Sequence, residues 1–194
     1  HQASQSDSSF ALAYLGMALV HPTHSQEEAS AYFKEALKYK ANTSPEEQAV
    51  IDAFNQPNTI QIVQGLQDVI EQFPDEPILM YSLGQMQFSA QKHLDAVETF
   101  VQLLEIDKSW YAVYNSIGYS YMKLDKPKNA EKAFKTQIEK LGGNANSYDS
   151  MGEFYLSQNK FPEAIKLYRY ALIKDKMLLS SHKGLAKSYA YVEE

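Results

Sequence analysis

The 194-residue chain contains no cysteine, which excludes disulfide bonds, thiolate metal sites and a cysteine nucleophile. Glycine and proline are scarce, with eight and seven residues, so the composition does not fit low-complexity disorder. No stretch approaches the roughly 18 consecutive apolar residues that a transmembrane helix requires, so we expect no membrane interaction. Apolar residues make up 44% of the chain, which is enough to build a core, and we expect the chain to fold throughout.

An excess of positive charge is also absent, since the formal net charge is -6. Nucleic-acid-binding proteins normally meet phosphates with clustered Lys and Arg, so we expect no nucleic acid partner. The charge is unevenly distributed: residues 1–76 hold three basic and eleven acidic residues, and residues 77–194 hold fifteen basic and thirteen acidic residues. This asymmetry either steers an ionic partner or reflects solvated outer helix faces.

Catalytic motifs are missing as well. The sequence has no G-x-S-x-G, no H-E-x-x-H and no glycine-rich strand-to-helix turn. The five histidines lie in no recognisable metal or nucleophile motif; they are His1, His21, His24, His93 and His182. Pro22 separates the two closest of them, and no third ligand is near in sequence. We therefore predict no enzyme activity, no cofactor and no metal site.

What the sequence does contain is a pattern that repeats every 34 residues. Within residues 111–143, apolar and small positions fall on one face of each of two predicted helices. They are Tyr114, Ile117, Gly118 and Tyr121 on the first helix and Ala130, Phe134 and Ile138 on the second. The same order recurs on both sides, with Gly84 and Gly152 in the place of Gly118. Two such helices form a hairpin, and a fixed period of this length indicates a helical solenoid.

The period divides the chain into five hairpins and a terminal helix. They are predicted at about 9–42, 43–76, 77–110, 111–144 and 145–178, with the terminal helix at 179–192. The second hairpin is degenerate because Val50 stands where the other hairpins carry glycine. Its first helix should begin at about Pro45, with Ser44 as the N-cap, and break at Pro57. Because each hairpin buries its face against its neighbours, we predict one domain over residues 1–194.

The repeating glycine is interpreted as a packing device. Its missing side chain lets the two helices of a hairpin cross closely, while aromatic and aliphatic neighbours fill the remaining space. Lys92, Lys126 and Lys160 recur at the same period and mark the turn between the two helices.

The order aromatic, aliphatic, glycine, tyrosine, then alanine and aromatic resembles the tetratricopeptide repeat (TPR) family. The resemblance implies an all-α fold, a right-handed superhelical solenoid of antiparallel helix hairpins. It also implies a non-catalytic protein-protein interaction scaffold that receives a peptide or a partner helix in its concave groove. Residues 144–153 resemble a repeat variant often found in bacterial proteins, which implies a bacterial source and a cytoplasmic, periplasmic or secreted location.

A second stripe on the predicted first helices points away from the core stripe, and the resemblance implies that it lines the groove. Spacings of three and four keep each set on one helical face. The candidate binding residues are Tyr81, Gln85 and Phe88, then Asn115, Tyr119, Met122 and Lys123, and finally Asp149 and Glu153. Exposed Tyr, Phe and Met are typical of adaptable binding surfaces. For Phe88 and Met122, packing against the next repeat is the alternative.

The charged residues on this stripe limit the chemical classes of ligand that we expect. The chain lacks the lysine, asparagine and arginine set with which a TPR subgroup grips the C-terminal carboxylate of chaperones. Asp149 and Glu153 instead favour a basic or amide-bearing ligand, unless Asp149 only complements the N-terminus of its helix.

Three functional hypotheses follow. The leading one is a binding module for a protein segment of unknown identity. The second is a self-assembly element whose unpaired terminal helices stack on other copies to give a homo-oligomer. The third is a regulatory or appended domain of a larger bacterial protein.

Overall fold

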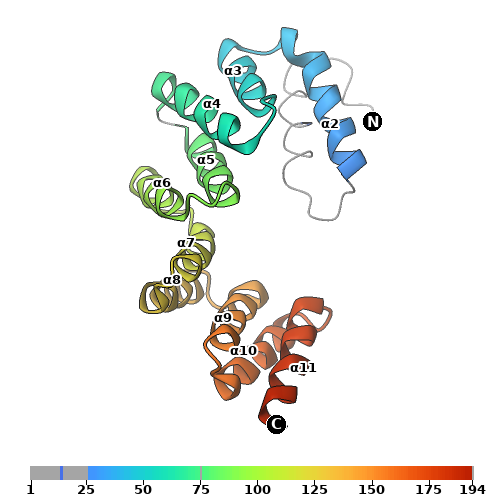
Figure 1. Ribbon diagram of the computed structural model, residues 1–194, viewed down its shortest axis with the longest axis vertical. Helices are drawn as coiled ribbons and strands as arrows, with labels where there is room; N and C mark the ends of the chain where they lie inside the picture. Colours follow the sequence, from blue (N-terminus) through green and yellow to red (C-terminus); the bar gives the residue numbers. More distant parts are fainter. Residues whose placement is uncertain (1–13, 15–25, 75, 194) are drawn as a thin grey trace. The chain divides into compact units, whose positions relative to one another are not determined.

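The computed structural model describes Tyr14, residues 26–74 and residues 76–193 (Figure 1). Over these residues the secondary structure consists of α-helices and one short 3-10 helix, with no strand. Consecutive helices pair as antiparallel hairpins, so the predicted fold class is confirmed. Most of the first helix predicted for residues 9–42 lies outside the described residues. The chain divides into two compact units, residues 1–79 and 80–194, which we describe one at a time.

In the first unit the helix starts follow local sequence signals. Ser44 accepts a hydrogen bond from the backbone N–H of Glu47, and the Glu47 carboxylate accepts one from the backbone N–H of Ser44. This capping box confirms the predicted helix start at Pro45. Asn58 caps the next helix through the backbone N–H of Gln61. The elements are α2 (Gln26–Tyr39), η2 (Lys40–Asn42), α3 (Pro45–Phe54) and α4 (Thr59–Gln72).

The degenerate hairpin of α3 and α4 achieves close packing in its own way. Val50 is buried, and the small residue at the contact lies instead on α4. A Cβ atom added to Gly65 would lie 3.0 Å from the Cα atom of Ala53, so the two backbones approach closely there. Ile51 and Leu66 are fully buried in the core of the same unit.

The second unit continues the hairpins to the last described residue (Figure 1). Helix α7 packs on α8, and α9 packs on both α10 and α11. The helices are α5 (Pro77–Ser89, which crosses the boundary between the units), α6 (His93–Ile106), α7 (Val113–Lys123), α8 (Pro127–Lys140), α9 (Ala145–Ser157), α10 (Phe161–Lys174) and α11 (Leu179–Glu193).

The repeating glycines of this unit each face an aromatic ring of the second helix. A Cβ atom on Gly84 would lie 2.5 Å from a ring atom of Phe100, and one on Gly118 would lie 2.6 Å from the ring of Phe134. Gly152 stands in the same relation to Tyr168. Because these distances are far below van der Waals contact, the glycine is what lets the ring enter the hairpin.

The turns between paired helices share one backbone conformation. Gln91, Asp125 and Asn159 have positive φ angles of 63°, 52° and 57°. Each precedes the repeating lysine of the turn, and the lysine N–H donates to a carbonyl five residues earlier, as Lys126 does to Tyr121. The repeated left-handed residue ends one helix and turns the chain into the next.

Candidate functional site

The nine predicted binding residues occupy α5, α7 and α9 of the second unit, and we call the surface they define the first-helix face. Side-chain hydrogen bonds connect these helices one after another. The bonds span 31 or 34 residues in sequence, which is about one repeat. Tyr119 and Glu153 occupy equivalent positions of successive repeats, and the 31-residue bonds join positions that differ by three residues, which is about one helical turn.

The link between α5 and α7 passes through Gln85. The Gln85 side-chain amide donates to the Tyr81 hydroxyl at 3.0 Å, and the Gln85 carbonyl oxygen accepts from the Ser116 hydroxyl at 3.3 Å. The Tyr81 ring packs against Phe100 and Trp110, with centroid distances of 6.2 and 5.3 Å. Tyr81 and Gln85 are thus held in place by neighbours on both sides.

The link between α7 and α9 is the hydrogen bond from the Tyr119 hydroxyl to the Glu153 carboxylate, 2.7 Å long. The Tyr119 ring meets Phe134 edge to face, with centroids 5.3 Å apart. Burial, followed by the hydrogen bond to Glu153, holds the pKa of Tyr119 well above its ordinary value. Glu153 is exposed, so this pair presents a carboxylate to solvent.

Asp149 lies deeper than the other acidic residue of the face. Its side chain is 9% exposed, and its carboxylate accepts hydrogen bonds from the hydroxyls of Ser180 and Ser181 on α11. The bond from Ser180 is 2.8 Å long. The Asp149 carboxylate therefore joins α9 to the last helix.

Asn115, at the middle of the face, has an unsatisfied acceptor. Its Oδ1 atom is buried and has no hydrogen-bond partner in the described part of the protein. Leaving a buried acceptor unpaired costs about 1 to 3 kcal/mol.

The three remaining residues differ in their surroundings. Phe88 contacts the His93 ring, with centroids 5.1 Å apart. Met122 is half-buried and packs against the core cluster that contains Ala130 and Phe134. Lys123 is exposed at the end of α7.

Sequence reasoning missed the serines that complete these links. Ser116 bridges to Gln85, and Ser180 and Ser181 bind Asp149. A signal existed for the first of them, because Ser82, Ser116 and Ser150 recur with the same 34-residue period as the glycines. A small polar side chain at that position can cross to the preceding first helix.

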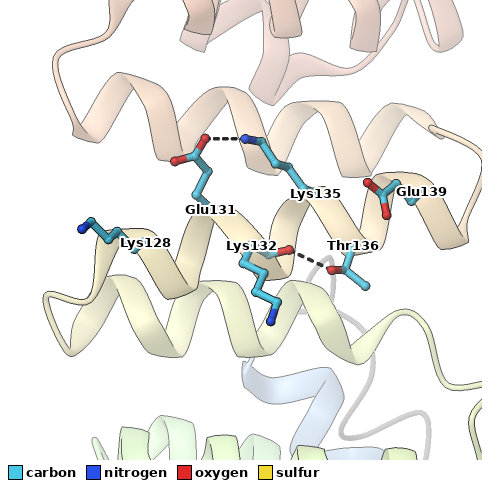
Figure 2. Close-up of a pocket in the computed structure, with 6 residues that line it drawn as sticks. All are labelled: Lys128, Glu131, Lys132, Lys135, Thr136 and Glu139. Atoms are coloured by element: carbon cyan, nitrogen blue, oxygen red, sulfur yellow. Dashed lines mark hydrogen bonds and ion pairs between the residues drawn. The ribbon is translucent and has the colours of Figure 1, made fainter.

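None of the helices in the described residues has the length and apolar character needed to cross a membrane. Nor do their His, Asp and Glu side chains gather in a group of three that could hold a metal ion. The outer side of α8 carries a shallow depression lined by charges of both signs, in which Lys135 pairs with Glu131 (Figure 2).

The fold and the linked first-helix face define a repeat protein built of stacked helix hairpins. The family model described as "Tetratricopeptide repeat" matches residues 111–139. A thermophilic TPR protein from Thermus thermophilus has a similar solved structure, with a TM-score of 0.74 and 16% identity over 93% of this chain and 99% of that chain. The chain thus carries a tetratricopeptide repeat within a TPR-type fold, and the resemblance to the TPR family is confirmed, whereas the bacterial source stays a prediction.

Two further proteins are similar over different spans. The anaphase-promoting complex subunit CDC16 of Saccharomyces cerevisiae is 23% identical over 168 residues, which is 82% of this chain and 20% of CDC16. The chain thus spans about a fifth of the length of that relative. The first TPR of Spaghetti (RPAP3), solved bound to the HSP90 peptide SRMEEVD, has a TM-score of 0.56 and 17% identity, covering 61% of this chain and 94% of that one.

Proposed function

We propose that the protein is a non-catalytic binding module that holds a segment of a partner protein on its first-helix face. The observation that carries this proposal is the Glu153 carboxylate, which is held by the hydroxyl of Tyr119 on the neighbouring first helix and is exposed to solvent. A backbone N–H or a side-chain amide of a bound segment can donate to it. A hydrogen bond to a charged group is stronger than one between neutral groups, so this carboxylate is the strongest polar anchor on the face.

The hydrogen bonds between helices support the same proposal. Gln85 bonds to Tyr81 on its own helix and to Ser116 on α7. Tyr119 on α7 and Glu153 on α9 bond to each other. A surface whose side chains are already ordered loses less conformational entropy when a ligand binds. The structural neighbour that is bound to a peptide supports a peptide segment as the kind of ligand.

The expected ligand carries amide and basic groups. Glu153 is the exposed carboxylate of the face, and besides the bond from Tyr119 it can accept from a lysine, an arginine or a backbone N–H of the ligand. Lys123 lies at the far end of α7, so one acidic group near an end of the segment fits as well. Asp149 is not included among the ligand contacts because both its oxygens bind α11.

The test selects peptides from a displayed 12-residue library on the wild-type protein and measures their affinities by calorimetry. We expect Asn115→Ala and Tyr119→Ala each to weaken the selected peptides at least tenfold. Glu139→Ala, an exposed change on α8, is the matched control and should leave the affinity unchanged. Peptides that bind all four proteins equally well would exclude the first-helix face.

A specific observation also favours the second hypothesis, self-assembly through the terminal helix. Met177, Leu179 and Val192 near and on α11 are 86%, 62% and 53% exposed. Leu179 and Val192 lie at opposite ends of α11, and apolar side chains this exposed can be covered by a second copy. Light scattering over a range of concentrations distinguishes the two, because a protein that remains monomeric throughout cannot use this surface for assembly. That the chain is an appended domain of a larger protein stays a prediction.

A further inference from the structure

A second apolar surface lies in a groove formed by α6, α7 and α8, which uses a different set of α7 side chains from the first-helix face. Its floor comes from α7, with Tyr114 and Ile117, and its walls come from α6 and α8. Val101, on the α6 wall, is 43% exposed. The α8 wall is built from the small side chains of Ala133 and Thr136.

We call the meeting point of α6, α7 and α8 the earlier junction and the equivalent meeting point of α8, α9 and α10, one repeat later, the later junction. The later junction shows how this space is closed elsewhere in the chain. The residue 34 positions after Thr136 is Tyr170, and the one 34 positions after Tyr114 is Tyr148. The rings of Tyr148 and Tyr170 pack together, with centroids 5.5 Å apart. Leu167 likewise replaces Ala133. The later junction therefore fills with its own side chains the space that the earlier junction leaves open.

Among the described residues, the later junction also has polar contacts that the earlier junction lacks. Lys135, the counterpart of Val101, pairs with Glu131, which also accepts a hydrogen bond from Tyr155, the counterpart of Tyr121. At the earlier junction Val101 offers no such charge. Figure 2 shows Glu131 and Lys135 on one side of α8 and Thr136 on the other, where its hydroxyl bonds to the backbone oxygen of Lys132.

The rim of the groove carries one charge of each sign. Glu105 lies on the α6 side and Lys132 on the α8 side, and both are exposed. No ion pair of either side chain occurs among the described residues. A ligand that brings an opposite charge to each rim would be oriented by them.

We propose that this outer groove binds a protein segment that inserts one aromatic side chain over Tyr114, in the space that Tyr170 occupies at the later junction. The segment carries a basic residue on the side of Glu105 and an acidic residue on the side of Lys132. Aromatic anchors seated in a pocket and flanked by polar contacts are the usual centres of protein interfaces. This surface is separate from the proposed function and does not depend on it.

The first test uses p-cresol, the side-chain analogue of tyrosine, in an NMR titration. We expect saturable shifts of the Ala133 and Thr136 amides in the wild type and at least tenfold weaker binding to Thr136→Tyr, which supplies the missing ring. Val101→Lys changes an exposed side chain, so it tests the same wall without disturbing the core and should also weaken binding. Equal binding to all three proteins, or equal shifts at Tyr148 and Tyr170, would overturn the proposal.

The second test identifies the ligand class by selecting a displayed 12-residue peptide library on the wild type after depletion on Thr136→Tyr. Enriched peptides should share an aromatic residue between a basic and an acidic one, and Lys132→Glu should weaken them at least tenfold. Peptides without an aromatic residue, or peptides lost on Asn115→Ala, would contradict the assignment. Sedimentation velocity tests the remaining alternative, in which a second copy of the chain occupies the groove. A wild-type dimer that Thr136→Tyr dissociates would overturn the proposed partner segment in favour of that second copy.

Discussion

The carboxylate of Asp149 accepts a hydrogen bond from the hydroxyl of Ser181, and both side chains are buried between α9 and α11. The neighbouring Ser180 donates to the second carboxylate oxygen. A charged residue that the sequence places on a binding stripe thus fastens the last helix to the array.

We expect Asp149→Ala to lower the free energy of unfolding by about 1 to 3 kcal/mol, because two hydroxyls lose their acceptor and Ser181 is left buried and unpaired. Hydrogen exchange should accelerate in α11 before other helices. Asn146→Ala is the control, since Asn146 lies about one turn before Asp149 on the same helix and is exposed. The same loss of stability in both variants would contradict a structural role specific to Asp149.

Gly118 and Phe134 should behave as a coupled pair. Gly118→Ala places a Cβ atom where the Phe134 ring lies, and overpacking of this kind typically costs about 1 to 3 kcal/mol. In a Phe134→Leu background the same change should cost clearly less, because the ring is gone. Urea unfolding of the four proteins in this double-mutant cycle measures the coupling, and strictly additive losses would refute the packing argument.

The turn residues with positive φ offer a stabilising substitution. Gln91→Gly should stabilise the protein by about 0.5 to 1 kcal/mol. An L-residue in the left-handed region costs about 1 to 2 kcal/mol, which glycine avoids. Part of this stabilisation is offset because glycine increases the conformational entropy of the unfolded chain. Asn159→Gly tests the same turn position with a residue that tolerates the left-handed region better than glutamine, so its effect should be near zero. Thermal unfolding of both variants measures these changes in stability. A Gln91→Gly variant less stable than the wild type would contradict the expected relief of backbone strain.

Stability should fall at alkaline pH because of three tyrosines. Burial, followed by the hydrogen bond to Glu131, raises the pKa of Tyr155 to about 12. Burial also holds the pKa values of Tyr119 and Tyr168 well above the ordinary value of about 10. Above that pH the unfolded chain loses protons that the folded protein retains, so the unfolded state binds fewer protons and the free energy of unfolding decreases as pH rises.

Urea unfolding at pH 8, 9, 10 and 11 checks this dependence. The stability attributable to these groups is fully present at pH 8 and 9 and is lost progressively above pH 10, toward the raised pKa values. Tyr155→Phe should show a shallower decline than the wild type. An increase of stability between pH 10 and 11 would be incompatible with the raised pKa values.

Much of the fold follows from local patterns. The 34-residue period, the capping box at Ser44 and the glycine that faces a ring in each later hairpin are all properties of residues close together in the chain. Helical periodicity assigns each side chain to a face, and a hairpin is a local structure, so the all-α hairpin array could be predicted. The grouping of Tyr119 and Glu153 on adjacent first helices also agrees with that periodicity.

The partners of the candidate site residues were decided only by the tertiary structure. Periodicity gives the face of a helix, but it does not say whether Asp149 reaches solvent or the serines of α11, which lie about one repeat away in sequence. The unpaired oxygen of Asn115 and the open space beside Thr136 likewise depend on the side chains that neighbouring repeats bring to each junction. The amino-acid sequence by itself determined the repeating hairpin, because its contacts are local. The stacking of one hairpin on the next determined which polar groups are satisfied and which surfaces stay open, because burial and hydrogen bonding depend on atoms from several repeats at once.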